Sequence, residues 1–558
     1  MKRSKTLIIF LLVFSLMLTS VACGKKSGED TSNSSSKVED NKKDDDTKKV
    51  EDDKKEEKAK LHLLGPDKGG DIKFADREKY PVWKEVQKLL DAANLDLEYE
   101  IVPAEQYKVV IQTRMASASD LPDIANVSPL DDTTVLNLAR QGVILELNSL
   151  ADEHSNGNIK KFYNEYFPYA KQLTTLPDGK MYWFSNLHKK LYKGTEPAPV
   201  ALTMNIRKDW LDKLNIPVPT TADEYFNALK TMRDKDANGN GQKDEILIYD
   251  PARFNGAIAQ WFGLGTNITA VDVENKKVVS PWYQEGVKDY FKYLQKLIQA
   301  DIIDTSLIGA GSEEVQQKIT ENKTASITDY NMETYREPTI EGGGEYMPLM
   351  PLKAVDGIEP AAQLESPFLV WKKFAVTKNC KNPEAAIAFF DIIYSEEYAD
   401  LLFWGIEGLT YEVGDDGVKK FKDITGSFDT QLANEGKIAG QQVFGDTVFP
   451  RVQFANLEYE LQGRPEYKTN HQLEIMTYKP YFYNKNYLAI PDDDQLEKKT
   501  QILNDITTYS EELATKLALG QKSLDDWDKY MADLKELGLD ELIEIDQQLL
   551  DRYFSLEK

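Results

Sequence analysis

The chain has 558 residues, more than one hydrophobic core usually serves, so at least two domains or lobes are expected. Its 93 acidic and 68 basic residues give a formal net charge of −25, which opposes binding to nucleic-acid phosphates and anionic lipid headgroups. Two cysteines and four histidines exclude a disulfide scaffold and leave little material for a zinc cluster. Any site must therefore rely mainly on carboxylates, amides and aromatic rings.

The first 22 residues have the pattern of an export signal. A basic start precedes an apolar run, 7–18, that is too short to span a membrane, and small residues then lead to Cys23. This order resembles a bacterial lipoprotein signal, in which the cysteine receives palmitate-type acyl chains and becomes the mature N-terminus. Ser20 departs from the leucine usual three positions before that cysteine. The alternative is a cleaved secretory signal followed by an incidental cysteine.

A charged segment follows the signal. Residues 24–60 contain 11 lysines, 12 acidic residues and only three apolar side chains. Such a segment cannot bury enough surface to offset its ordering entropy, so a disordered tether is expected over residues 23–60. A binding tail is the alternative, but the charges of both signs are interspersed and nearly cancel, which favours a solvated linker.

From residue 61 onward, short apolar strands alternate with amphipathic helices, which predicts an α/β fold. Strands are expected at 61–64 and 97–102, with a helix at 81–93 between them. Pro81 suits the first turn of that helix, where its missing N–H would have no intrahelical partner. Further helices with apolar residues at three and four spacing are expected at 221–233, 285–299, 383–394 and 497–518.

Several segments have sequences that are specific in combination. The strongest is RKDWL at 207–211, followed by IPVPTT at 216–221. The others are SASDLPDI at 117–124, FAV at 374–376, KNPEAA at 381–386, GIEG at 405–408 and LDDW at 524–527. Their order and spacing resemble the extracellular solute-binding proteins (family 1) of bacterial ABC importers, in the large lipoprotein branch associated with saccharide uptake.

This resemblance implies a two-lobe, periplasmic-binding-protein-like α/β fold that encloses its ligand by hinge closure. By analogy, one lobe comprises 61–184 and 350–400, the other comprises 200–345 and 405–480, and C-terminal helices within 481–558 pack on the lobes. It also implies a monomer at the outer face of the membrane of a Gram-positive bacterium. The lipid anchor alone would hold it there, and it would pass its ligand to the transmembrane subunits of an ABC permease.

A polar loop, 234–245, follows one of the expected helices. Oxygen-bearing side chains at every second position and a glycine at the sixth are typical of a loop that wraps calcium. Starting at Asp234 gives the EF-hand spacing with Gly239 sixth, whereas starting at Asp236 places Gly241 sixth. The resemblance favours the second register, with a structural calcium ion. The ligands would then be Asp236, Asn238, Asn240, the Gln242 carbonyl, Asp244 and Glu245. A metal-free Asn/Gly turn is the alternative.

A saccharide site needs aromatic platforms beside amides and carboxylates, because sugars present apolar ring faces and hydroxyl edges. Most of the 28 Tyr, 22 Phe and 8 Trp residues must belong to the core, as expected for Trp210 and Trp527 on amphipathic helices. The candidates near the expected crossovers and loop tips are Tyr182, Trp183, Asn205, Trp261, Tyr330, Trp371, Trp404 and Glu407.

Three functions compete at this stage. The first is a non-enzymatic binding lipoprotein that captures a carbohydrate, preferably an oligosaccharide, and delivers it to a permease. The second is a secreted glycoside hydrolase, which would need two carboxylates roughly 5 to 9.5 Å apart. The third is a peptide-binding or sensor protein of the same fold. The sequence contains no HExxH, GxSxG, GxGxxG or phosphate-loop motif, so no catalytic residue is assigned.

Overall fold

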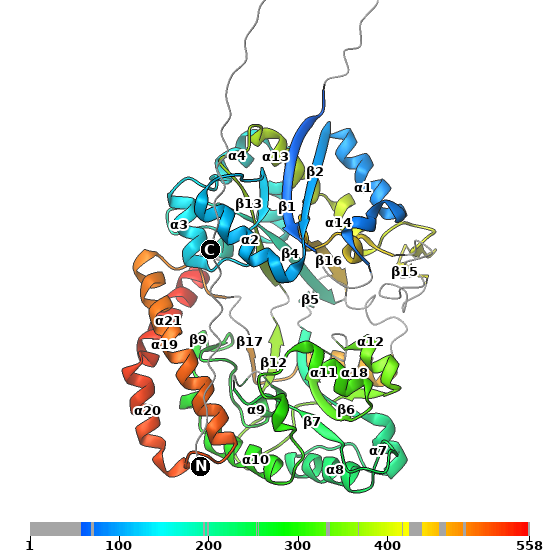
Figure 1. Ribbon diagram of the computed structural model, residues 1–558, viewed down its shortest axis with the longest axis vertical. Helices are drawn as coiled ribbons and strands as arrows, with labels where there is room; N and C mark the ends of the chain where they lie inside the picture. Colours follow the sequence, from blue (N-terminus) through cyan, green and yellow to red (C-terminus); the bar gives the residue numbers. More distant parts are fainter. Residues whose placement is uncertain are drawn as a thin grey trace, which may run out of the picture. The chain divides into compact units, whose positions relative to one another are not determined.

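The computed structural model describes most of the chain beyond its first 56 residues (Figure 1). The described ranges are 57–67, 72–192, 196–197, 200–252, 254, 256–330, 335–365, 368–415, 417–422, 438–456, 465–483 and 487–555. All of them belong to one compact unit, Glu56–Lys558. The expected signal peptide 1–22, Cys23 and most of the expected tether lie outside the described residues. Within these ranges, no helix has the length and apolar character needed to cross a membrane.

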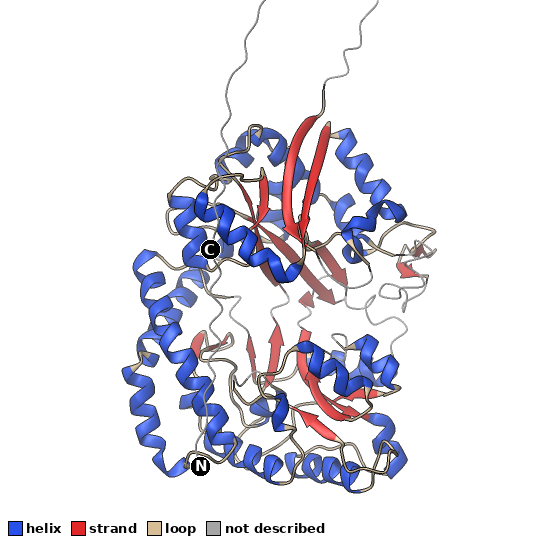
Figure 2. Ribbon diagram, in the orientation of Figure 1, coloured by secondary structure: helices blue, strands red, loops and turns tan. Residues whose placement is uncertain are grey.

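The first sheet has seven strands (Figure 2). They are β1 (Ala59–Pro66), β2 (Leu95–Val102), β3 (Ile124–Asn126), β4 (Phe184–Tyr192), β5 (Glu196–Pro197), β13 (Phe368–Val376) and β16 (Val452–Asn456). Their order is β16-β4-β13-β3-β1-β2, with β5 paired to β4. β1 is parallel to β2 and β3, β16 is parallel to β4, and β13 is antiparallel to both β3 and β4. The return strand β13 therefore completes this sheet.

Helices pack on both faces of the first sheet. One apolar cluster joins the sheet to α1 (Pro81–Ala92), α13 (Pro383–Ile393) and α14 (Glu396–Phe403). A second cluster joins it to α2 (Ala104–Ser117) and α3 (Asp132–Arg140). The expected helix at 81–93 is confirmed, and its proline occupies the first turn. The shorter helices of this part are α4 (Asn148–His154), α5 (Asn158–Lys161), α6 (Pro168–Thr174) and α16 (Gly440–Val443).

The second sheet has eight strands. They are β6 (Val200–Arg207), β7 (Ile246–Ile248), β8 (Ala270–Asp272), β9 (Lys277–Val279), β10 (Thr324–Asp329), β11 (Tyr346–Pro348), β12 (Ala362–Glu365) and β17 (Tyr481–Tyr483). Their order is β7-β10-β6-β12-β17-β8-β9, with β11 paired to β6. Outside both sheets, β14 (Tyr411–Val413) pairs with β15 (Lys419–Phe421). The described chain is therefore a mixed α/β structure with two large sheets and one two-stranded sheet.

The helices around the second sheet confirm the sequence patterns. They are α7 (Lys208–Leu214), α8 (Ala222–Asp234), α9 (Ala257–Trp261), α10 (Val287–Gln299), α11 (Ser312–Thr320), α12 (Arg336–Gly342) and α18 (Glu466–Ile475). α8 begins at a capping box, because the Thr221 side chain accepts the Glu224 N–H and the Glu224 side chain accepts from the Thr221 backbone. Trp210 and Trp527 are buried in this core, as their helical spacing predicts.

Three C-terminal helices complete the described chain: α19 (Asp493–Ala518), α20 (Trp527–Glu536) and α21 (Leu539–Ser555). α19 starts before the expected residue 497, because Asp492 and Gln495 form a capping box there. Most of its apolar residues pack in the core of the second sheet, whereas Leu496 in its first turn packs in a cluster of the first sheet. One helix thus contributes to both cores.

The sequence-based division into lobes was wrong at two places. Leu352 packs in the core of the second sheet and β12 pairs with β6, so the return to the first sheet occurs after residue 365 instead of near 350. Residues 438–452 were expected in the second lobe, yet Val448 and Phe449 pack in the core of the first sheet, and β16 pairs with β4. Strand partners distant in sequence decide both boundaries, and the local hydrophobic pattern does not encode them.

His471 in α18 predicts a pH dependence of stability. Its Nε2 lies 3.3 Å from the Leu349 carbonyl oxygen, its Nδ1 is buried without a hydrogen-bond partner, and burial lowers the pKa of the ring from 6.5 to about 4. Between these values the unfolded chain binds a proton that the folded chain rejects, so stability falls as the pH decreases from about 6.5 to about 4.

We expect this one group to lower the free energy of unfolding by roughly 2 to 3 kcal/mol over that interval. Urea denaturation of the wild type and His471→Gln at several pH values measures it. In the variant, the free energy of unfolding should not show this decrease between pH 6.5 and 4. An unchanged slope in His471→Gln would contradict the assignment.

Candidate ligand-binding site

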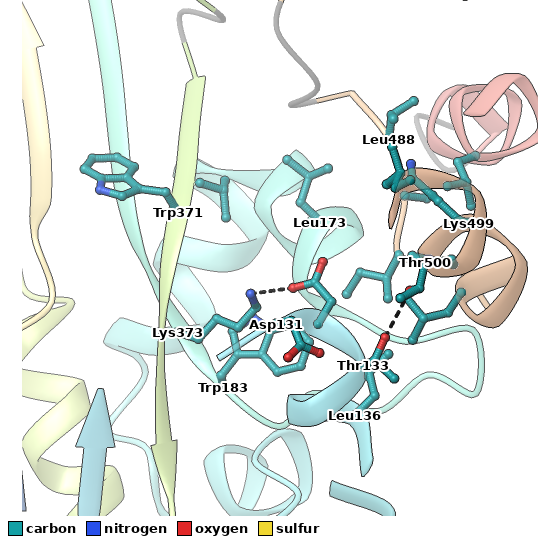
Figure 3. A pocket seen from close by; sticks show the side chains of 18 of the residues that line it. Asp131, Thr133, Leu136, Leu173, Trp183, Trp371, Lys373, Leu488, Lys499 and Thr500 are labelled. Atoms are coloured by element: carbon teal, nitrogen blue, oxygen red, sulfur yellow. Dashed lines mark hydrogen bonds and ion pairs between the residues drawn. The ribbon is translucent and has the colours of Figure 1, made fainter. Parts of the chain in front are cut away.

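A cavity of about 540 Å³ lies beside the first sheet, between β4, β13, the start of α3 and the first half of α19 (Figure 3). Its apolar lining includes Trp183, Leu136, Leu173 and Leu496, and its polar lining includes Asp131, Asp132, Thr133, Ser185, Lys373, Lys499, Thr500 and Asn504. An aromatic ring next to hydroxyl, amide and charged groups is the combination by which a pocket binds a polar organic molecule.

The Trp183 ring and an ion pair form one wall. Lys373 Nζ lies 2.6 Å from Asp132 Oδ1 and 5.8 Å from the centroid of the Trp183 ring. Asp131 is the N-cap of α3, and its carboxylate accepts the backbone N–H and the hydroxyl of Thr134, each at 2.8 Å. Burial opposes ionisation there, but these hydrogen bonds hold the pKa of Asp131 below its usual value. Both carboxylates at the start of α3 therefore already have partners.

A bulge in β13 directs neighbouring side chains to different sides of the strand. The register to β4 shifts between Trp371 and Phe374, and Lys372 adopts a φ of 66°. Trp371 borders the cavity, but Figure 3 shows its ring on the opposite side of β13 from Lys373 and Trp183. The two tryptophans consequently serve two different surfaces.

The C-terminal helices provide the facing wall. The hydroxyls of Thr133 and Thr500 lie 3.2 Å apart and join α3 to α19. Lys499 forms an ion pair with Asp546 of α21, whose side chain is buried. The hydroxyl of Thr269 donates to the second oxygen of Asp546 at 2.7 Å. The charge of Lys499 is therefore balanced below the cavity surface.

The polar loop between α8 and β7 is organised around one carboxylate. Asp236 accepts the backbone N–H groups of Gly239 and Asn240, both at 3.0 Å, and that of Gly241 at 2.8 Å. Gly241 has a φ of 83°, which glycine adopts without strain. Asp234 lies at the end of α8 and pairs with Lys230 and Arg233. The turn thus follows the spacing that starts at Asp236.

The same loop fits a cation with oxygen ligands. Glu245 is buried, its Oε1 accepts the Asn238 N–H at 2.9 Å, and its Oε2 has no hydrogen-bond partner. Burial, together with the carboxylates of Asp236 and Asp244, raises the pKa of Glu245. Among the described residues, no three histidine, cysteine, aspartate or glutamate side chains are grouped closely enough to hold a metal ion by themselves. Amide and backbone oxygens would have to complete the ligand set, as calcium permits.

Comparison with known proteins identifies the family. Residues 75–400 match the model of the bacterial extracellular solute-binding protein family. The chain belongs to this family. One curated relative, the fructooligosaccharide ABC transporter substrate-binding protein FusA of Streptococcus pneumoniae, is 26% identical over 464 residues, which cover 78% of this chain and 81% of FusA. Another, the polygalacturonan/rhamnogalacturonan-binding protein YtcQ of Bacillus subtilis, is 25% identical over 351 residues, covering 60% and 64%.

Solved structures support the two-lobe fold of this solute-binding protein. FusA of S. pneumoniae in complex with kestose aligns with a TM-score of 0.68 and 20% identity, covering 89% of this chain and 100% of FusA. A solute-binding protein of Bifidobacterium longum infantis, described as binding HMO, aligns with a TM-score of 0.64 and 21% identity, covering 89% and 99%. At these identities the likeness extends to the fold alone.

The structure of this solute-binding protein brings only some of the sequence candidates to the cavity. Trp183 lines it, and Trp371 borders it. Tyr182 borders a neighbouring cavity of about 360 Å³, beside Arg140 and residues 491–494. Two of the eight candidates therefore lie at this cavity, and their role in ligand binding stays a prediction.

Two further candidates are buried in the core around the second sheet. Trp261 is buried and makes an edge-on contact with Tyr225 at 4.9 Å between ring centroids. Asn205 is buried, and its side-chain amide donates to the carbonyl oxygens of Thr203 and Asp329 at 3.1 and 2.9 Å. Neither lines the 540 Å³ cavity, and both stabilise the interior around β6.

The last three candidates also lie away from the cavity. Trp404 is buried against Phe421 of β15, with ring centroids 4.5 Å apart, and Glu407 is exposed in the turn before β14. Tyr330 is half-buried directly after β10. Their sequence neighbourhoods resemble loop tips, but the Trp404 ring completes a small aromatic core.

Sequence reasoning missed the charged residues of the site. Asp131 and Asp132 precede an apolar helical pattern, which is an N-cap signal that could have located the start of α3. Lys373 follows Trp371 by two residues, a spacing that a regular strand would place on one face. The bulge at Lys372 separates them, and no residue type in this segment signals it.

The buried pair of Lys499 and Asp546 predicts a large effect on stability. Asp546→Ala leaves the ammonium group of Lys499 unpaired in a site where only 15% of the Lys499 side chain is exposed. We expect the free energy of unfolding to fall by roughly 3 to 5 kcal/mol, and the double variant Lys499→Met/Asp546→Leu to recover most of the loss.

Urea denaturation measures both variants. Lys516→Gln, which breaks the exposed Lys516–Glu512 pair, is the control and should cost less than about 1 kcal/mol. A loss in Asp546→Ala no larger than in this control would contradict a buried, interdependent pair.

Proposed function

We propose that this protein captures a carbohydrate, preferably an oligosaccharide, and delivers it to the transmembrane subunits of an ABC permease. The observation that carries the proposal is a 540 Å³ cavity beside hydroxyl and amide groups and a neutralised ion pair, with the edge of the largely buried Trp183 ring at its wall. Sugars use such a surface because their ring faces stack on aromatics while their hydroxyls bond to polar groups. FusA and YtcQ carry carbohydrate names, which supports the same class of ligand.

The arrangement favours binding over hydrolysis. Glycoside hydrolysis needs an acid and a second carboxylate on opposite sides of the bond. Asp131 and Asp132 are adjacent at one wall, where the first caps α3 and the second pairs with Lys373. Asp546 beneath the facing wall is buried and bonded to Lys499 and Thr269. None of these carboxylates is poised as a general acid. A peptide ligand remains the competing proposal, which the binding panel described below separates.

Delivery requires a conformational signal, which the two-sheet organisation can provide. The described chain passes between the sheets from β4 to β6, from β12 to β13, and from β16 to α18. A ligand that binds the closed form better than the open form shifts the population toward the closed form. The permease would then recognise the closed shape, and the binding protein itself would perform no covalent step.

A lipid anchor and a calcium ion complete the proposal. The lipoprotein pattern supports acylation of Cys23, and the charged segment to residue 60 would serve as a tether. The protein would act as a monomer at the extracellular face of the cell membrane. The loop from Asp236 to Glu245 would bind one structural calcium ion through Asp236, Asn238, Asn240, the Gln242 carbonyl, Asp244 and Glu245.

The Trp183 platform can be tested by calorimetry and thermal shift. The mature chain with Cys23→Ser is titrated with neutral mono- and oligosaccharides, uronides and short peptides. We expect one saccharide class to bind and to stabilise the protein by roughly 2.7 kcal/mol at 100 times its dissociation constant. Trp183→Ala should lose several-fold in affinity, because contact with an aromatic ring contributes on the order of 1 kcal/mol.

The control for this test is Trp404→Phe, which changes a tryptophan outside the cavity and should bind as the wild type does. Stabilisation by peptides and by none of the sugars would replace the carbohydrate proposal with the peptide one. Equal affinity of Trp183→Ala and the wild type would remove Trp183 from the site.

The calcium proposal predicts a difference between two carboxylates that are eleven positions apart. The wild type should melt at a higher temperature in millimolar calcium than in chelator, since only the folded loop presents all its oxygens. Glu245→Gln should abolish this difference. Asp234→Asn should retain it, because Asp234 pairs with Lys230 and Arg233 outside the loop. Loss of the calcium effect in Asp234→Asn would favour the register that starts at Asp234, in which Glu245 is the twelfth residue and is also a ligand.

A further inference from the structure

A second aromatic surface lies across β13 from the cavity. Trp371 is half-buried on that side. The centroid of its ring lies 6.2 Å from the centroid of the His188 ring and 5.9 Å from the guanidinium carbon of Arg451. Trp371 lies opposite Asn186 in the register of β13 with β4. β4 and the turn before β16 thus contribute polar side chains around one tryptophan of β13.

A tightly held turn positions the charged groups of this surface. Asp446 has a φ of 70°, unusual for a residue with a side chain, and its N–H donates to the Phe449 carbonyl at 3.1 Å. The buried Asn126 amide donates to the Thr447 carbonyl at 3.0 Å. Gly65 of β1 lies directly beneath, where a Cβ would come within 2.7 Å of the Thr447 oxygen. The surrounding sheet therefore imposes this conformation.

A buried asparagine connects the two charged side chains. The Asn186 side chain is fully buried, its amide donates to Asp446 Oδ1, and its oxygen accepts the Arg451 backbone N–H at 2.7 Å. Arg451 in turn forms an ion pair with Asp446 Oδ2. The two side chains are 21% and 19% exposed, so each presents an edge to solvent, and the Arg451 guanidinium lies beside the Trp371 ring. The buried asparagines therefore fix where the ion pair lies relative to the sheet.

The chemistry of this surface distinguishes between classes of sugar. The carboxylate accepts hydrogen bonds from sugar hydroxyls and the guanidinium donates hydrogen bonds to hydroxyl oxygens, so a neutral sugar stacked on Trp371 can bond to both while their charges stay balanced. A uronate would bring a second carboxylate next to Asp446 and would have to compete with Asp446 for Arg451. The charges at the cavity are balanced in the same way, because Lys373 pairs with Asp132 and Lys499 pairs with Asp546.

We propose that Trp371, Asp446 and Arg451 form a sugar-binding subsite separate from the Trp183 wall, and that this subsite selects neutral saccharides over uronides. The proposal rests on the carbohydrate function proposed above and specifies its ligand class. Asn126 and Asn186 are positioning residues, which hold the Asp446 turn and the ion pair and touch no ligand themselves.

The test compares affinities by titration calorimetry on the mature chain with Cys23→Ser. The probes are neutral gluco- and fructo-oligosaccharides and oligogalacturonides of matched length. The wild type should bind a neutral probe at least tenfold more tightly than its uronide counterpart. Trp371→Ala should lose at least tenfold in affinity for the neutral probe, and Trp371→Phe should lose less. Asp446→Asn should reduce the affinity for the neutral probe and should make the affinities for the neutral and uronide probes more similar.

A matched control lies elsewhere in the chain. Lys419 pairs with Asp400 at 2.8 Å and lies 5.8 Å from the Trp404 ring centroid, so it repeats the same combination of tryptophan, cation and carboxylate away from the proposed subsite. Lys419→Gln and Asp400→Asn should change no affinity. Circular dichroism and melting curves confirm that each variant is folded, and Trp371→Phe keeps the test informative if Asp446→Asn does not fold.

Each other outcome identifies what fails. Neutral binding within twofold of the wild type in folded Trp371→Ala and Trp371→Phe overturns the subsite, while the carbohydrate function stands. Tenfold preference of the wild type for uronides overturns the ligand class. Failure of the wild type to bind either class of sugar overturns both this inference and the proposed function, whereas in the other two outcomes the wild type still binds a sugar.

Discussion

The first sheet depends on the insertion of β13 between β3 and β4. The chain leaves this sheet after β4, builds most of the second sheet, and returns through β12 before β13 forms antiparallel ladders on both sides. Without that strand, β4 and β16 would have no hydrogen-bonded connection to β1, β2 and β3. The same strand separates the Trp183 cavity from the Trp371 surface. The pairing that completes the fold therefore also sets the positions of both candidate ligand-binding faces.

Much of this architecture could be predicted from local pattern, because the information lies within single elements. The proline in the first turn of α1, the capping box of α8 and the apolar spacing of α10 and α13 each identify a helix without reference to the rest of the chain. The lobe boundaries could not be predicted from local pattern. The partner of β16 is β4, more than two hundred residues earlier, and a short apolar strand carries no signal that names its neighbour.

The site was predicted only in part for a related reason. Trp183, Trp371 and Trp404 all lie near polar residues and turns in the sequence, yet one lines a cavity, one faces the other side of a strand, and one is buried against Phe421. Which way a ring points depends on bulges and long-range contacts. The charged partners were missed because an ion pair such as Lys373 with Asp132 joins residues far apart in sequence. The loop from Asp236 to Glu245 could be located because its candidate ligands are consecutive.

The double attachment of α19 limits how the two sheets can move. Its first turn packs in the first sheet's cluster through Leu496, while the turns from Ile502 onward pack in the core of the second. A continuous helix of 26 residues transmits displacement with little bending, over a length of roughly 39 Å. Rotation of one sheet against the other must therefore either use this first turn as its axis or detach it. In mechanical terms α19 is a lever whose fulcrum is beside the Trp183 cavity, so small changes there produce larger movements at the distant end of the helix.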